Sequence, residues 1–153
     1  MDGLGTDPMR RKRQMEAVAR FPAAELLSAY AAMAAGAPAA RAVRGPEVGL
    51  VMVRGRAGGG GQPFHLGEAS VVRATVMLDT GEVGHATILG RDSERARVAA
   101  HLDALWQRDD WRDRIEQDVV APAERLRAQT ERREAEEAEA TRVDFFTLAR
   151  GED

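Results

Sequence analysis

Residues 71–89, VVRATVMLDTGEVGHATIL, decide the fold of this chain. Apolar side chains alternate around Arg73 and Thr75, and residues 83–89 carry a second strand pattern. Such alternation is typical of strands that bury one face. Residues 79–81, DTG, form a short glycine-containing connection of the kind found in hairpins. The segment therefore predicts an antiparallel β-hairpin.

A further strand and a capped helix flank this hairpin. Residues 48–53 are apolar and rich in β-branched side chains, as strands are. After the hairpin, Asp92 or Ser93 offers a side-chain oxygen as a helix N-cap. Apolar residues then recur on one helical face, at Val98, Leu102, Leu105 and Trp106. We expect an antiparallel sheet from about residue 48 to residue 89, followed directly by a helix.

Helical patterns occupy both ends of the chain. Residues 8–20 and 22–35 are predicted as helices, because each begins with a proline, which the first turn tolerates well. A helix should also hold Trp111, Ile115 and Val119, with Pro122 opening or kinking the next one.

Residues 124–142 alternate opposite charges one helical turn apart, as in Arg127/Glu131, which is typical of a long solvated helix. The predicted fold class is α+β: a small antiparallel sheet packed with N-terminal and C-terminal helices. We expect a single domain over residues 1–153, with residues 1–8 disordered.

The length and composition of the chain exclude several classes of protein. A chain of 153 residues buries roughly 68–70% of its unfolded surface, enough for a real core. The absence of cysteine excludes disulfides, thiolate zinc sites and thiolate-held iron–sulfur clusters. The basic residues 10–13 precede no apolar segment of a secretory signal, and no apolar run approaches the ~20 residues of a membrane span. We expect a cytoplasmic chain that crosses no membrane.

The net charge of −3 argues against a main role in binding nucleic acid. Of the 22 basic residues 21 are arginine, whose fork of donors suits phosphate and carboxylate; the alternative is a compositional bias of the genome, since alanine is also abundant throughout. The glycine run 58–61 could bring backbone N–H groups to an anion, with Arg56, Gly58 and Gly59 as candidates. No Lys-Ser or Lys-Thr follows, so a flexible connection between strands is the alternative. Arg73 and Arg91 are further candidates, the alternative being salt bridges at a strand edge or helix start.

The sequence gives little support for a metal site or for a nucleophilic serine. His65, His85 and His101 match no zinc-binding spacing, and we expect no metal site. Ser70 lacks the second glycine of a nucleophile elbow. No catalytic residue is assigned.

Apolar residues reappear at the C-terminus, at Val143, Phe145, Phe146 and Leu148. Side chains of this size gain roughly 1.5–3 kcal/mol each on burial, so this segment, residues 143–153, should dock on its own domain or on a neighbour. The preceding charged helix offers few apolar residues to cover them. We therefore predict that these four residues form an intersubunit contact, with another subunit or a second copy of the chain.

Several blocks of sequence are informative together: residues 56–59 (RAGG), 64–69 (FHLGEA), 72–74 (VRA), Gly84, 88–92 (ILGRD), 103–105 (DAL) and 142–151 (RVDFFTLARG). With these blocks in this order, the chain resembles the PhnG family, the small G subunit of the carbon–phosphorus lyase core complex. The resemblance runs from about residue 9 to residue 151, and its most specific block is the ending.

This resemblance implies an accessory subunit in phosphonate catabolism. With the H, I and L subunits, the family takes part in transferring ribose triphosphate from ATP to methylphosphonate with release of adenine, while the J subunit later breaks the C–P bond. The implied partners are thus the PhnH-, PhnI-, PhnJ- and PhnL-type subunits. MgATP would be a substrate of the assembly, and this chain would hold no cofactor. The rival hypothesis is an independent phosphate- or nucleotide-binding enzyme that uses the glycine run and the arginines.

Overall fold

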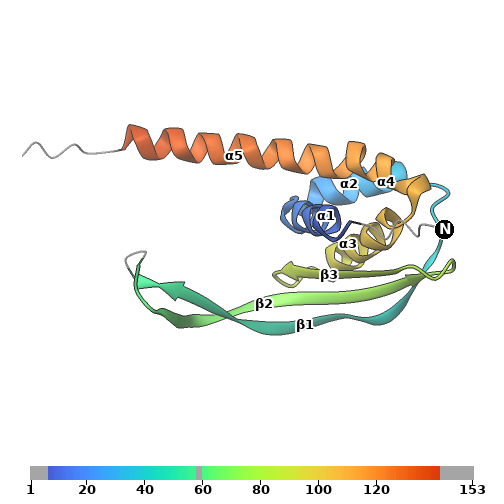
Figure 1. Cartoon of the computed structure of the whole chain (residues 1–153), viewed down its shortest axis with the longest axis horizontal. Helices are drawn as coiled ribbons and strands as arrows, with labels where there is room; N and C mark the ends of the chain where they lie inside the picture. Colours follow the sequence, from blue (N-terminus) through green and yellow to red (C-terminus); the bar gives the residue numbers. More distant parts are fainter. Residues whose placement is uncertain (1–6, 58–59, 142–153) are drawn as a thin grey trace, which may run out of the picture.

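The computed structural model describes residues 7–57 and 60–141 and has an α+β architecture. Its elements are α1 (Pro8–Arg20), α2 (Ala23–Met33), β1 (Ala40–Arg56), β2 (Pro63–Leu78), β3 (Val83–Leu89), α3 (Ser93–Trp106), α4 (Asp109–Ile115), the π-helix η2 (Glu116–Val120) and α5 (Ala121–Ala140). The strands form one sheet in the order β1-β2-β3. The helices lie over one face of this sheet, and α5 projects beyond them on the same side as the far end of β1 and β2 (Figure 1). The predicted fold class is confirmed.

The hairpin of residues 71–89 is present as predicted. β2 and β3 pair antiparallel from Val71 opposite Leu89 to Met77 opposite Val83. The connection contains Gly81 at φ 105°, a conformation that glycine adopts without steric cost.

The strands β1 and β2 are much longer than predicted. β1 begins at Ala40 and β2 at Pro63, and the two pair antiparallel along their whole length. Residues 40–44 and 63–68 are exposed, so no alternation of buried and exposed positions marks them as strand. Of the glycine run 58–61, Gly60 and Gly61 lie between these two strands, whereas Gly58 and Gly59 lie outside the described residues, so both interpretations of the run stay predictions.

The core lies between the sheet and α3. On β2 the buried side chains Val72, Ala74, Val76 and Leu78 alternate, and they face the helices. α3 is capped as predicted, because the Asp92 carboxylate accepts a hydrogen bond from the Arg95 amide at 2.9 Å. Ten of its fourteen residues are buried.

The free edge of β3 is closed by side chains from α1 and α3. The buried carboxylate of Asp103 accepts two hydrogen bonds from Arg11, at 2.9 and 2.7 Å, and one from the His85 amide at 2.8 Å. Gln107 and Arg11 donate to the Val83 carbonyl oxygen. This cluster, the Arg11–Asp103 clasp, satisfies backbone groups that an exposed edge would leave open.

The C-terminal helices follow one another from Asp109 to Ala140. Pro122 lies in the first turn of α5, and the π-helix directly precedes it. Because proline lacks an amide hydrogen, it breaks the regular α-helical ladder at this point.

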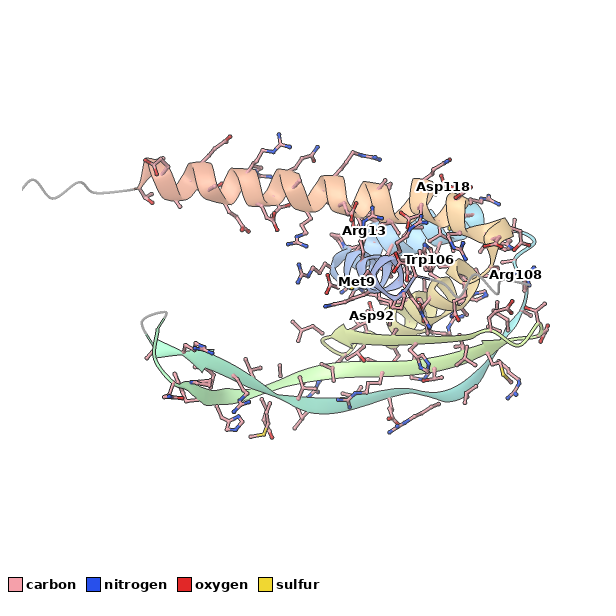
Figure 2. All side chains as sticks on the ribbon, viewed as in Figure 1. Met9, Arg13, Asp92, Trp106, Arg108 and Asp118 are labelled. Atoms are coloured by element: carbon pink, nitrogen blue, oxygen red, sulfur yellow. The ribbon has the colours of Figure 1, made fainter. Side chains whose placement is uncertain are left out.

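A polar network ties these helices to the N-terminus. The Glu116 carboxylate accepts from the indole of Trp106 at 3.1 Å and from Arg13 at 3.0 Å, while Arg13 also binds Glu124 at 2.7 Å. Arg13 and Trp106 are labelled in Figure 2. Leu126 and Ala128 of α5 are half-buried, and from residue 129 to residue 140 the helix is exposed; the predicted pair Arg127–Glu131 forms on its surface at 2.6 Å.

Candidate functional site

The arginines predicted to bind phosphate do not share one site. Arg73 lies on β2, on the sheet face opposite the helices, where its Nη1 atom would be 3.1 Å from a Cβ at Gly49. Arg56 is the last residue of β1 and pairs with Pro63, ten residues along β2 from Arg73. At about 3.3 Å per residue, those ten positions span roughly 33 Å.

Arg91 is exposed in the turn between β3 and α3. Gly58 and Gly59 lie outside the described residues, as do Val143, Phe145, Phe146 and Leu148. Binding of phosphate by Arg73 or Arg91 therefore stays a prediction.

A cavity of about 250 Å³ lies between the sheet, α2 and α3. It is lined by Tyr30, Ala39, Ala40, Ala42, Gly45, Pro46, Ala74, Val76, Arg97 and His101. Next to it, the pairing of β1 with β2 shifts twice, between Ala42 and Arg44 and between Arg44 and Glu47. Such bulges bend a strand and are frequent beside functional sites.

Gly45 permits this bulge to lie close to β2. Its φ is 68°, and a Cβ there would be 2.5 Å from the backbone oxygen of Arg73. A side chain at this position would collide with the neighbouring strand. The shape of this wall of the cavity therefore depends on Gly45.

The polar side of the cavity is a hydrogen-bonded chain from Tyr30 to His101 to Pro38. The Nε2 atom of His101 is 2.9 Å from the Pro38 carbonyl oxygen, which only accepts, so Nε2 carries the hydrogen. Nδ1 then accepts from the Tyr30 hydroxyl at 2.7 Å. Burial lowers the pKa of His101 and raises the pKa of Tyr30, so both groups are neutral.

Arg97 brings a positive charge to the same cavity. It is exposed and lies one turn before His101 on α3. Arg97 lines the same cavity as Tyr30 and His101, and its charge lowers the pKa of both. Among residues 7–57 and 60–141 it forms no hydrogen bond or ion pair.

This arrangement suits binding rather than catalysis. The cavity lining holds no carboxylate, serine or cysteine, and both ring nitrogens of its histidine are engaged. In the described part of the chain, no three His, Cys, Asp or Glu side chains are grouped to hold a metal ion. None of the described helices is long and apolar enough to cross a membrane.

A second feature is the far end of the β1–β2 hairpin, which we call the β arm (residues 48–56 and 63–70). β3 ends opposite Val71, so β2 has no second neighbour along the arm among the described strands. Large apolar side chains are exposed there: Val48, Leu50, Met52, Val53, Phe64 and Leu66. Val48, Leu50 and Met52 continue the face that carries the core residue Val72. Exposed apolar groups of this extent mark interaction surfaces.

Sequence reasoning missed both features. The cavity depends on three elements that are distant in sequence, although the spacing of Arg97 and His101, one helical turn apart, was a visible signal. The arm was missed because the strand predicted before the glycine run covered only residues 48–53, and Phe64 and Leu66 were assigned to no element.

Comparisons with known proteins agree with the resemblance in sequence. The family model described as phosphonate metabolism protein PhnG matches residues 9–151. A similar protein is the alpha-D-ribose 1-methylphosphonate 5-triphosphate synthase subunit PhnG of Rhizobium meliloti (strain 1021), which is 54% identical over 144 residues. The match covers 94% of this chain and 91% of that protein. On these grounds the chain belongs to the PhnG family of phosphonate metabolism proteins.

Proposed function

We propose that this chain is an accessory subunit of an alpha-D-ribose 1-methylphosphonate 5-triphosphate synthase. The observation that carries the proposal is its 54% identity to the Rhizobium meliloti subunit across nearly the whole length of both chains. In this proposal the assembly transfers ribose triphosphate from MgATP to methylphosphonate and releases adenine. The chain itself holds no cofactor.

The described structure supports an accessory role in two ways. The cavity offers no nucleophile and no free general base, as acyl- or glycosyl-transfer chemistry would need. The β arm instead exposes an apolar surface that a partner subunit would bury, with Leu50 57% and Met52 62% exposed. PhnH-, PhnI-, PhnJ- and PhnL-type subunits are the proposed partners.

Activity measurements on separated and assembled subunits test this function. The purified chain should not release adenine from MgATP and methylphosphonate, whereas the assembly should do so only when the chain is present. Adenine release by the chain alone would favour the rival hypothesis of an independent nucleotide-binding enzyme. Full activity of an assembly that lacks the chain would also contradict the proposal.

The C-terminal segment is the second proposed contact with partners. We expect Phe145→Ala combined with Phe146→Ala to give a folded, soluble chain that no longer assembles, because aromatic anchors at an interface often contribute ~2 kcal/mol or more each. Size-exclusion chromatography with the partner subunits measures assembly. A large drop in the melting temperature of the isolated double variant would instead show that the segment packs on its own domain.

A further inference from the structure

The cavity between α2, α3 and β1 contains a cation, Arg97, that no residue of the described part of the chain neutralises. Arg97 belongs to its lining, and the lining includes no Asp or Glu. Within residues 7–57 and 60–141, this guanidinium forms no hydrogen bond or ion pair. All five of its N–H donors therefore remain available to an external acceptor, and oxyanions are the acceptors that arginine binds best.

Opposite the polar chain of Tyr30 and His101, the wall carries small apolar side chains. Ala39, Ala40, Ala42, Ala74 and Val76 line it. Small side chains leave the volume open, and an apolar wall favours contact with hydrocarbon. The ligand should therefore combine an anionic head with a short apolar group.

The size of the cavity limits the ligand further. At about 250 Å³ it is smaller than the ~300–1,000 Å³ of pockets that bury drug-sized molecules. A nucleoside triphosphate, with its base, ribose and three phosphates, exceeds this space. A molecule with few non-hydrogen atoms fits.

Tyr30 favours a phosphonate over a carboxylate as the anionic group of the ligand. Its hydroxyl hydrogen is donated to His101 Nδ1, so its oxygen offers only a lone pair to a ligand. A monoprotonated phosphonate has a P–OH group that can donate to this oxygen, while its other oxygens accept from Arg97. A carboxylate has no such donor.

We propose that this cavity is a binding site for a small alkylphosphonate, with the alkyl group against the alanine wall and the oxyanion on Arg97. The preference for a phosphonate rests on the proposed function as well as on Tyr30, whereas binding of a small organic anion follows from the cavity alone. The site would supply or position the phosphonate for the assembled subunits.

Calorimetric titration of the full-length chain, alone and in its assembly, tests the proposal. Methylphosphonate should bind, and Arg97→Gln should weaken that binding at least about tenfold, because a charge-assisted contact is lost. Ala42→Leu should also weaken binding by filling the cavity without changing its charge. The control Arg133→Gln removes an exposed arginine on α5 and should change nothing. Circular dichroism confirms that each variant is folded.

Competing ligands identify what the site recognises. Inorganic phosphate, which lacks the alkyl group, and acetate, which lacks the P–OH donor, should both bind more weakly than methylphosphonate. In Tyr30→Phe the preference over acetate should shrink. Equal affinity for phosphate and methylphosphonate would overturn the alkyl subsite, and unchanged binding in Arg97→Gln would overturn the site as a whole.

The outcome is separable from that of the proposed function. A chain that binds methylphosphonate but joins no assembly refutes the function and leaves the site standing. Conversely, the assembly could be active although methylphosphonate binding depends on Arg97 in neither the isolated chain nor the complex. That result refutes the proposed binding site and leaves the proposed function standing.

Discussion

Gly84 is the position where β3 and α3 approach most closely, and Gly84→Ala should be strongly destabilising. A Cβ at Gly84 would be 2.5 Å from the Ala104 amide nitrogen and 2.8 Å from the Ala104 Cβ, and closer still to the Ala100 carbonyl oxygen. Ordinary contacts of a Cβ begin near 3.4 Å. The atoms in the way are mostly backbone, so no side-chain rotation relieves the clash.

The magnitude follows from the movement required. To restore 3.4 Å from 2.5 Å, α3 must move at least about 1 Å away from β3, and the closer contact with the Ala100 carbonyl oxygen requires more; ten of the fourteen residues of α3 are buried. Overpacking by one methyl group usually costs about 1–3 kcal/mol. Because a whole helix must shift, we expect a loss at the top of that range, about 3 kcal/mol, against a typical total stability of ~5–15 kcal/mol.

Urea unfolding of the full-length chain, followed by circular dichroism, measures this loss. Gly60→Ala is the matched control, because a Cβ at Gly60 would meet nothing within 4 Å. The control should stay within about 0.5 kcal/mol of wild type. The packing argument is refuted if Gly84→Ala and Gly60→Ala unfold at the same urea concentration.

Three further predictions concern the clasp, the cavity and the arm. Asp103→Ala should lower the free energy of unfolding by about 2 kcal/mol, because the part-buried Arg11 loses its carboxylate partner and the His85 amide loses its acceptor. Arg127→Ala on the surface should change the free energy of unfolding by less than ~1 kcal/mol, and equal effects of the two variants in urea unfolding would contradict this. Burial holds the pKa of His101 below 6.5, so the contribution of the neutral imidazole to stability is complete above that pH and falls as the pH drops toward the folded-state pKa. His101→Gln should therefore reduce the loss of stability between about pH 7.5 and 5.5. Parallel curves of unfolding free energy against pH for wild type and variant would contradict this. Leu50→Ser with Met52→Ser should leave the melting temperature of the chain unchanged but weaken co-purification with partner subunits, and a chain that still assembles fully would exclude the arm as a contact.

The local pattern of the sequence predicted the elements that bury one face. Residues 71–89 alternate because β2 and β3 rest on α3, and Asp92 was recognisable because a helix start requires a capping oxygen. In contrast, residues 63–68 are exposed on both faces, so burial imposes no period on them. This part of β2 can be recognised as a strand only from its pairing with β1 in the structure.

The candidate site was less predictable than the fold. The candidate site combines Tyr30, Arg97 and His101, which lie on two helices, with the bulge of β1 that encloses the space between them. Apart from the one-turn spacing of Arg97 and His101, nothing in the local sequence around these three residues indicates that they line one cavity. That bulge depends on Gly45, and one glycine in a sequence with fifteen does not reveal a close approach between strands. The phosphate prediction relied on residue type alone, which says nothing about distance.

The Arg11–Asp103 clasp also determines when the chain can complete its fold during synthesis. Its two residues are 92 positions apart, and at ~5–20 residues per second a ribosome needs roughly 5–20 s to travel from one to the other. Throughout that interval α1 lacks the carboxylate that anchors it, and for most of it β3 has not been made either. α1 therefore leaves the ribosome before α3 but can dock only after it, and it stays open to chaperones until α3 has emerged.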